Sequence, residues 1–240
     1  MDIARALGAT EGICCFVGAG GKKTTMYALA HRVDRAVVTA TVRIPLFDDH
    51  VADLVLTEDP HTAIEAASQW PLGVVPAREG QDRYGGYDPE VFDPLDDSRA
   101  GVILVKADGA RMRRFKAPGD AEPQVPHNAT TVVPVVSAHV VGEPLDARRV
   151  HRPERVREIT GLSLGDPITA DVVGQVIACE DGGQKGVPGG ATVVPLVNMV
   201  DTPADERTGR AIAESIHRHA DLPYVVLASM RAESPLVDIV

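Results

Sequence analysis

Short apolar runs alternate along the chain with segments in which apolar residues recur every three or four positions. The first run, ICCFV at 13–17, is uniformly apolar, a pattern typical of a strand that is buried on both faces. The segment TTMYALAHRV at 24–33 has the spacing of a helix with one apolar face. A strand, a glycine turn and a helix in this order predict the first unit of an α/β fold.

The same alternation continues to the end of the chain, with Pro, Gly or Asp at the junctions. It predicts about seven or eight mostly parallel strands in a doubly wound sheet with helices on both faces. The chain shows no linker-like tract and no repeat, so we expect a single domain over residues 1–240. Further strands are expected at 36–40, 54–56, 72–75, 101–107, 130–136, 191–198 and 223–229, and helices at 3–7, 61–70, 89–95, 154–160, 170–179 and 205–219.

The sequence GAGGKKTT, residues 18–25, joins the first predicted strand to the first predicted helix. In a doubly wound sheet, ligands bind beyond the carboxyl ends of the strands, where glycines let backbone N–H groups approach an anion. The strict Walker A pattern is not met, because Lys22 is followed by a second lysine. The dinucleotide-binding pattern fails as well, since lysine occupies the position of its last glycine.

We therefore predict a shortened, P-loop-like turn that binds the phosphates of a nucleoside triphosphate with Mg²⁺. Lys22 or Lys23 would neutralise the phosphates, and the hydroxyl of Thr24 or Thr25 would ligate the metal. A glycine turn with two solvated lysines on its rim is the structural alternative. The residues predicted to contact the nucleotide here are Gly18, Ala19, Gly20, Gly21, Lys22, Lys23, Thr24 and Thr25.

Two further segments favour the same interpretation. The apolar run VILVKAD ends in Asp108, which is expected to lie beside the glycine turn and to hold magnesium together with Thr24. Lys22 and Asp108 are therefore the candidate catalytic residues.

In LVNMVD, Asn198 and Asp201 follow a predicted strand in the pattern with which GTPases contact guanine. Capping and turn formation are the alternatives for these polar residues.

Composition excludes several classes of function. The chain has 24 basic and 34 acidic residues and a net charge of −10, which argues against binding to nucleic acid or to an anionic membrane. Cys14 and Cys15 lie within an apolar run without the spacing of metal ligands, so we expect them to be buried. No apolar run reaches the about 18 residues of a membrane span, and we expect a cytoplasmic protein.

A cluster of basic residues follows Asp108 along the chain. Arginine binds phosphate through two parallel hydrogen bonds, so this cluster is a candidate site for a second anionic ligand or for an acidic patch on a partner protein. The alternative is a solvated loop whose charges pair with the acidic surface. The candidate residues for the second anion are Arg113, Arg114, Lys116, His151 and Arg152.

The motifs VGAGGKKTT, VTATVRIP, VKADGARMRRFKAPGDAEPQVP, GEPLDARRVHRPE and NMVD together resemble those of the YqeC-type proteins. The resemblance runs from about residue 12 to residue 201. It implies a P-loop-like fold and a role as an accessory protein in the maturation of selenium-dependent molybdenum hydroxylases. A molybdenum hydroxylase, or another molybdenum-cofactor enzyme, would then be the partner.

This chain departs from the pattern of that family at several positions. It has Lys23 where Thr or Ser is expected, Lys106 where Glu is expected and Met199 where Lys is expected, and Thr39-Ala40-Thr41 replaces a longer threonine run. The change at Lys106 removes a carboxylate near Asp108, which weakens the expectation of hydrolysis more than that of binding. Three hypotheses follow: a slow NTPase that assists maturation, a nucleotide sensor without turnover, and a phosphotransferase acting on a small anionic substrate.

Overall fold

In the computed structural model, which describes residues 1–95 and 98–240, ten strands form one sheet in the order β15-β14-β13-β10-β1-β8-β2-β5-β4, with β12 paired to β10. All neighbouring pairs are parallel except β14 and β15. The strands are β1 Gly12–Gly18, β2 Ala36–Ala40, β4 Asp53–Leu56, β5 Leu72–Val75, β8 Val102–Lys106, β10 Thr131–Ser137, β12 Thr192–Val193, β13 Leu196–Asn198, β14 Val226–Ala228 and β15 Leu236–Ile239.

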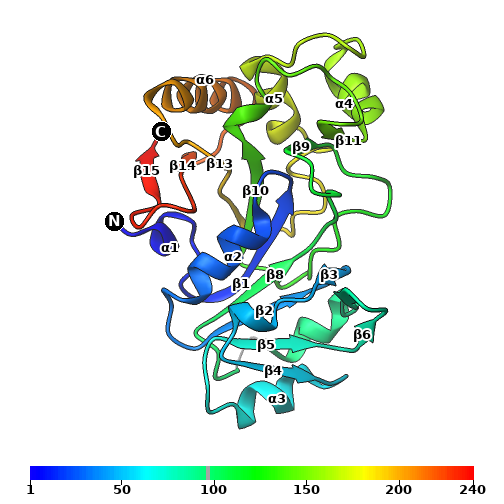
Figure 1. The fold of residues 1–240 in the computed structure, drawn as a ribbon, viewed down its shortest axis with the longest axis vertical. Helices are drawn as coiled ribbons and strands as arrows, with labels where there is room; N and C mark the ends of the chain where they lie inside the picture. The colour runs from blue at the N-terminus through cyan, green and yellow to red at the C-terminus, as the bar shows by residue number, and fades with distance from the viewer. Residues whose placement is uncertain (96–97) are drawn as a thin grey trace.

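Helices cover both faces of this sheet (Figure 1). The fold is therefore α/β and doubly wound, of the P-loop NTPase-like type, as the sequence predicts. The α-helices are α1 Ile3–Ala6, α2 Lys22–Ala30, α3 Pro60–Ala66, α4 Pro153–Thr160, α5 Ala170–Ala178 and α6 Pro203–His219, and the 3₁₀-helices are η1 Asp48–His50, η2 Pro89–Leu95 and η3 Ala138–Val140. Two small sheets pair β9 Phe115–Lys116 with β11 Val150–His151, and β7 Arg83–Tyr84 with both β3 Ile44–Pro45 and β6 Arg78–Glu79.

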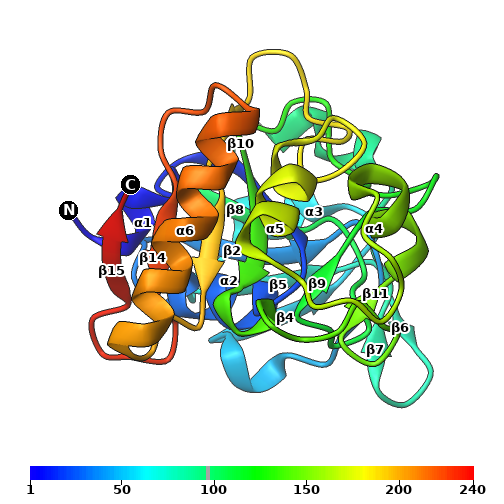
Figure 2. The ribbon, with the colours of Figure 1, turned by 90° about the horizontal axis from the view of Figure 1, so that it is seen from above.

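The alternation of side chains along β1 explains why its sequence is apolar throughout. Cys14 and Phe16 pack with Met26 of α2 on one face of the sheet. Cys15 points to the other face, where its cluster includes Ile64 of α3. A third cluster joins α4, α5 and α6 to β10, β13 and β14, and Figure 2 shows α5 and α6 side by side over these strands. Both cysteines are fully buried, as predicted.

Local sequence signals account for the ends of several helices. At the start of α6, Thr202 and Asp205 form a capping box around Pro203 in the first turn. Asp59 caps α3 by accepting a hydrogen bond from the Thr62 N–H. These polar caps satisfy backbone N–H groups that have no partner within the helix.

The predicted helices and central strands are confirmed, the helix at 89–95 as the 3₁₀-helix η2, and the differences concern short strands. Pro195 interrupts the predicted strand at 191–198, which is divided into β12 and β13 because proline cannot donate a ladder hydrogen bond. The antiparallel edge strand β15 was not predicted, nor were the two-residue strands of the small sheets. The strand count of seven or eight was therefore too low, since ten strands of the described chain join the large sheet.

The longest helix, α6, is amphipathic and ends in three basic residues. Among the residues that the structure describes, no helix has both the length and the apolar character that crossing a membrane requires.

Candidate functional site

The glycine turn lies at the carboxyl end of β1 and is pressed against the neighbouring strands. Gly20 and Gly21 have φ angles of 106° and 125°, in the region that favours glycine. A Cβ atom on Gly20 would lie 2.4 Å from the backbone nitrogen of Ser137, and one on Gly21 would lie 2.2 Å from Nδ2 of Asn198. These two positions therefore require glycine, both for conformation and for space.

The backbone N–H groups of the turn are available to a ligand. α2 begins at Lys22, directly after Gly21, so its first N–H groups have no acceptor within the helix. Among the described residues, no protein group accepts a hydrogen bond from the N–H groups between Gly20 and Thr24. Five N–H donors at the positive end of a helix dipole are thus free to bind an anion.

A cavity of about 220 Å³ lies over this turn, and its walls carry positive charge. Among the described residues lining it, none is acidic. The side chains of Lys23, Arg114 and Arg231 have no hydrogen-bond or ion-pair partner in the described part of the chain. Its lining residues are Ala19, Gly20, Gly21, Lys22, Lys23, Thr24, Ala110, Met112, Arg113, Arg114, Met199 and Arg231.

A second cavity of about 300 Å³ adjoins the first and is less charged. The two cavities share Gly21, Thr24, Arg114, Met199 and Arg231. The second cavity also reaches His139, Asn198, Asp201 and Met230. Together the two cavities offer a cationic compartment over the turn and a more neutral compartment beside it.

The predicted base contacts occupy different environments. Asn198 is buried and its amide is used within the protein: Nδ2 donates to the carbonyl of Gly20 at 2.8 Å, and Oδ1 accepts from the Met230 N–H at 3.2 Å. Its role in this structure is to hold the glycine turn against β13. Asp201 is exposed, lines the second cavity and accepts a hydrogen bond from the Ser229 hydroxyl.

Lys22 and Asp108, the candidate catalytic pair, are in direct contact. Lys22 Nζ lies 2.7 Å from Asp108 Oδ1 and also donates to the carbonyl of Gly18. Asp108 Oδ2 accepts from the Gly18 N–H at 2.8 Å and lies 2.8 Å from Nζ of Lys116. The carboxylate is 1% exposed and is surrounded by these donors. It therefore does not fit as a magnesium ligand here, and it does not share a cavity with Thr24.

The two threonines of the turn also differ. Thr25 is buried and its hydroxyl donates to the carbonyl of Gly21 at 3.2 Å, so it stabilises the start of α2. Thr24 lines both cavities and makes no hydrogen bond through its side chain within the described residues. Thr24 is accordingly the hydroxyl that a metal bound to phosphate would meet.

A chain of alternating charges runs from the glycine turn into the protein. Beyond Asp108, Nζ of Lys116 lies 2.6 Å from Glu122 Oε2, and Nη1 of Arg152 lies 2.7 Å from the same oxygen. Burial alone would raise the pKa of Glu122, but hydrogen bonds from Arg152 and Lys116 lower it to about 2. Lys22, Asp108, Lys116, Glu122 and Arg152 thus form one ion chain, and each carboxylate in it is held by two cations.

The members of the ion chain come from three of the quoted motifs: Lys22 from VGAGGKKTT, then Asp108, Lys116 and Glu122 from VKADGARMRRFKAPGDAEPQVP, and Arg152 from GEPLDARRVHRPE. The residues predicted to bind a second anion are consequently separated. Lys116 is buried within the ion chain, whereas Arg114 faces the two cavities over the turn. His151 and Arg152 line another cavity, and Arg113 lines both that cavity and the first cavity over the glycine turn.

Sequence reasoning did not identify Arg231, which lies in a polar stretch far from the glycine turn along the chain. The turn into β15 brings Arg231 to the cavity, and the sequence around Arg231 carries no motif that signals this.

Sequence reasoning also did not anticipate the environment of Lys106. This side chain is buried, donates to the carbonyl of Arg43 at 2.7 Å, and has its pKa lowered to about 7 by burial and by the nearby Lys22.

We expect Lys106→Met to alter how stability depends on pH. The folded-state pKa of Lys106 is about 7 and its usual value is 10.5, so between these pH values the unfolded chain binds more protons. Stability of the wild type should therefore rise with pH across this window, by up to about 1.4 kcal/mol per pH unit from this group. Urea unfolding at pH 7, 8 and 9 should show a flatter dependence for the variant, and equal slopes would contradict the prediction.

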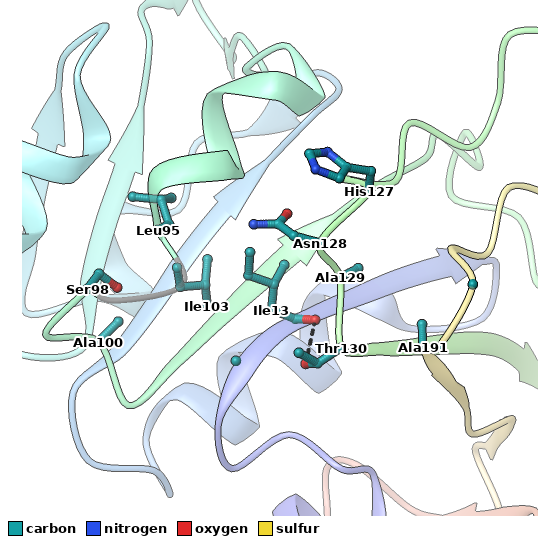
Figure 3. A pocket seen from close by; sticks show the side chains of 13 residues that line it. Ile13, Leu95, Ser98, Ala100, Ile103, His127, Asn128, Ala129, Thr130 and Ala191 are labelled. Carbon is teal, nitrogen blue, oxygen red and sulfur yellow. Dashed lines mark hydrogen bonds between the residues drawn. The ribbon is translucent and has the colours of Figure 1, made fainter.

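Another cavity, of about 490 Å³, lies at the opposite end of the strands, beside the start of β1. Figure 3 shows Ile13 of β1 and Ile103 of β8 side by side in its wall, with His127 and Asn128 near them. Two of its polar side chains are engaged: His127 lies 3.1 Å from Asp93, and Thr130 donates to the carbonyl of Ile13 at 3.1 Å. With no lysine or arginine among its described lining residues, it is a weaker candidate for an anionic ligand.

The chain is similar to known proteins over most of its length. A family model described as YqeC protein matches residues 14–154. A protein of Escherichia coli strain K12, described as "Uncharacterized protein YqeC", is 29% identical over an alignment of 189 residues, and the alignment covers 76% of this chain and 73% of that protein. The region matched by the family model contains the glycine turn and the whole ion chain, from Lys22 to Arg152.

Proposed function

The chain belongs to the YqeC family, and we propose that it binds a nucleoside triphosphate, with the phosphates in the cavity over the glycine turn. One observation carries this proposal. In a protein with a net charge of −10, Lys23, Arg114 and Arg231 face a cavity without any carboxylate partner. Cations that repel one another in this way are stabilised by a polyanion, and the free N–H groups of the turn supply directional hydrogen bonds to its oxygens.

The adjoining cavity is the place we propose for the nucleoside. It shares Thr24, Arg114 and Met199 with the first cavity, and its volume of about 300 Å³ suits a small organic group. Met199 offers a flexible apolar contact to a base. The carboxylate of Asp201 is the type of acceptor that the ring N–H and amino group of guanine require.

Within this proposal, Mg²⁺ enters together with the phosphates and meets the hydroxyl of Thr24. The metal would neutralise charge on the phosphate oxygens. The contacts of Asp108 favour binding over rapid hydrolysis, because this carboxylate is held by Lys22, Lys116 and the Gly18 N–H. We therefore favour a nucleotide-binding protein that acts through its bound state over a fast NTPase.

Calorimetric titration with ATP, GTP and CTP, with and without Mg²⁺, tests the proposal. We expect saturable binding to the wild type and an affinity about tenfold lower for Lys23→Ala, since a hydrogen bond to a charged group contributes about 1.5–3 kcal/mol. Arg207→Ala removes an exposed charge on α6 and should leave binding unchanged. Absence of binding to the wild type, or equal affinities for both variants, would refute it.

Two further measurements refine the assignment. A preference for GTP that disappears in Asp201→Asn would locate the base in the second cavity. Phosphate release should stay close to the spontaneous rate over hours in the absence of a partner. Release that is fast without a partner would instead support the NTPase hypothesis.

The maturation of a selenium-dependent molybdenum hydroxylase is the cellular role that we propose for this nucleotide binding. The support for it is the resemblance of the motifs, several of which form the ion chain. Molybdenum and selenium contents of a hydroxylase purified from cells with and without this protein would test the role. Equal molybdenum and selenium contents and equal hydroxylase activity would argue against it.

A further inference from the structure

A cavity of about 400 Å³ lies between the turn that follows Asp108 and the start of α4. It is separate from the cavities over the glycine turn, except that Arg113 lines both locations. Arg111, His151, Arg152 and Glu154 form the rest of its charged and polar lining. Its volume lies within the range of cavities that bind small molecules.

The charges around this cavity favour an anion. Three arginines face one carboxylate, that of the exposed Glu154. The charge of Arg152 is shared with Glu122, but Arg111 has no partner for its side chain among the described residues. Arg113 donates from Nε to the carbonyl of Ala147 at 2.9 Å, which orients its guanidinium group. Its other nitrogens have no acceptor in the described part of the protein.

The backbone holds Arg111 in an uncommon conformation. Arg111 and Met112 have φ angles of 46° and 61°, so two successive residues other than glycine are left-handed. Such a conformation costs about 1–3 kcal/mol per residue and persists where surrounding contacts impose it. A hydrogen bond of 2.9 Å from the Arg113 N–H to the carbonyl of Ala110 closes the turn. This turn places Arg111 at one cavity and Met112 at the other.

His151 adds a neutral hydrogen-bonding group to the same cavity. Burial, together with the positive charges of Arg152 and Lys116, lowers its pKa to about 4. At neutral pH the imidazole therefore carries one donor and one acceptor nitrogen. An arginine pair beside a neutral imidazole suits an oxyanion that also carries a hydroxyl or another polar group.

We propose that this cavity is a second ligand site, which binds a small phosphate-bearing molecule next to the nucleotide and shares Arg113 with the nucleotide cavity. In this site Arg111 and Arg113 would bind one oxyanion, and the neutral imidazole of His151 lies in the same cavity. It stands apart from nucleotide binding, because Arg111 and His151 do not line the cavities over the glycine turn.

The site can be tested by NMR with inorganic phosphate as the probe. The ring resonances of His151, assigned by comparison with His151→Gln, report occupancy of this cavity and not of the glycine turn. At pH 7 we expect a saturable change in these resonances on titration with phosphate, both with and without saturating Mg-ATP. Acetate, as a carboxylate probe, should give a weaker response because it carries one charge and no third oxygen.

Substitution of Arg111 separates a binding role from a structural one. Arg111→Gly removes the charge at a position whose φ of 46° suits glycine, so folding should be preserved. We expect phosphate affinity to fall about tenfold, as for the loss of one charge-assisted hydrogen bond. Arg148→Gln removes an exposed charge that does not line the cavity and serves as the matched control.

The outcomes distinguish the second site from the proposed nucleotide site. If His151 responds to phosphate in the wild type but ATP does not bind, the second site stands and nucleotide binding is refuted. If ATP binds but His151 shows no saturable response, or if Arg111→Gly responds like the wild type, the second site is refuted. A response of His151 that Lys23→Ala leaves unchanged would support two independent sites.

Discussion

Replacing Asp108 by asparagine is expected to lower the free energy of unfolding by about 3–5 kcal/mol, the range for removing one partner from a buried ion pair. Asp108 faces Lys22 at 2.7 Å and Lys116 at 2.8 Å, and all three side chains are at most 5% exposed. Asparagine keeps the size of the side chain and can still accept from the Gly18 N–H, so the substitution mainly removes charge. Two ammonium groups would then face each other without the carboxylate that separates them.

Urea unfolding measures this loss, and Asp221→Asn is the control. Asp221 is an exposed carboxylate without an ion-pair partner among the described residues, and its substitution should change stability by less than about 0.5 kcal/mol. High salt should not reproduce the effect of Asp108→Asn, because buried pairs are screened little. A loss below about 1 kcal/mol would show that the ion chain contributes little to stability.

A double-mutant cycle with Lys22→Met tests whether the ion chain acts as a unit. Once Lys22 is removed, Asp108 has one cation fewer to neutralise and its substitution should be less damaging. The free energy of unfolding lost in the double variant, Asp108→Asn and Lys22→Met, should therefore be smaller than the sum of the losses in the two single variants, by about 0.5–3 kcal/mol. Additive losses would mean that the two side chains do not interact in solution.

The largest expected effect on ligand binding belongs to the combined variant Lys23→Gln, Arg114→Gln and Arg231→Gln. These side chains have no protein partner among the described residues, so the variant should fold with at least the stability of the wild type. Its affinity for Mg-ATP should fall at least about 100-fold, because two or more charged hydrogen bonds of about 1.5 kcal/mol are lost. Calorimetry at constant ionic strength measures the difference.

The control variant removes the same number of positive charges from surface positions outside the cavities. Arg148, Arg157 and Arg207 are exposed and do not line the cavities over the turn. Their combined replacement by glutamine produces the same net charge, and it should weaken binding only slightly through the long-range field. Similar losses for both variants would indicate that net charge, and not the cavity, determines affinity.

Much of the site could be anticipated from sequence because its parts are local. The apolar run before Gly18 and the helical spacing after Lys22 define a strand, a turn and a helix without reference to the rest of the chain. The free N–H groups of the turn follow from this local geometry. The sequence also predicts Asp108 beside this turn, but as a magnesium ligand. Its ion pairs with Lys22 and Lys116 were not predicted, because they depend on how buried side chains are placed in space.

The sequence by itself determined the α/β fold, the central parallel strands and the position of the glycine turn, since hydrophobic periodicity and turn residues act over a few positions. The tertiary structure decided which charges face a ligand and which face one another. Lys22 and Lys116 are internal partners of Asp108, whereas Lys23, Arg114 and Arg231 are directed to a cavity. Coulomb interactions depend on distance in space and on burial, and neither quantity can be obtained from the order of residues along the chain.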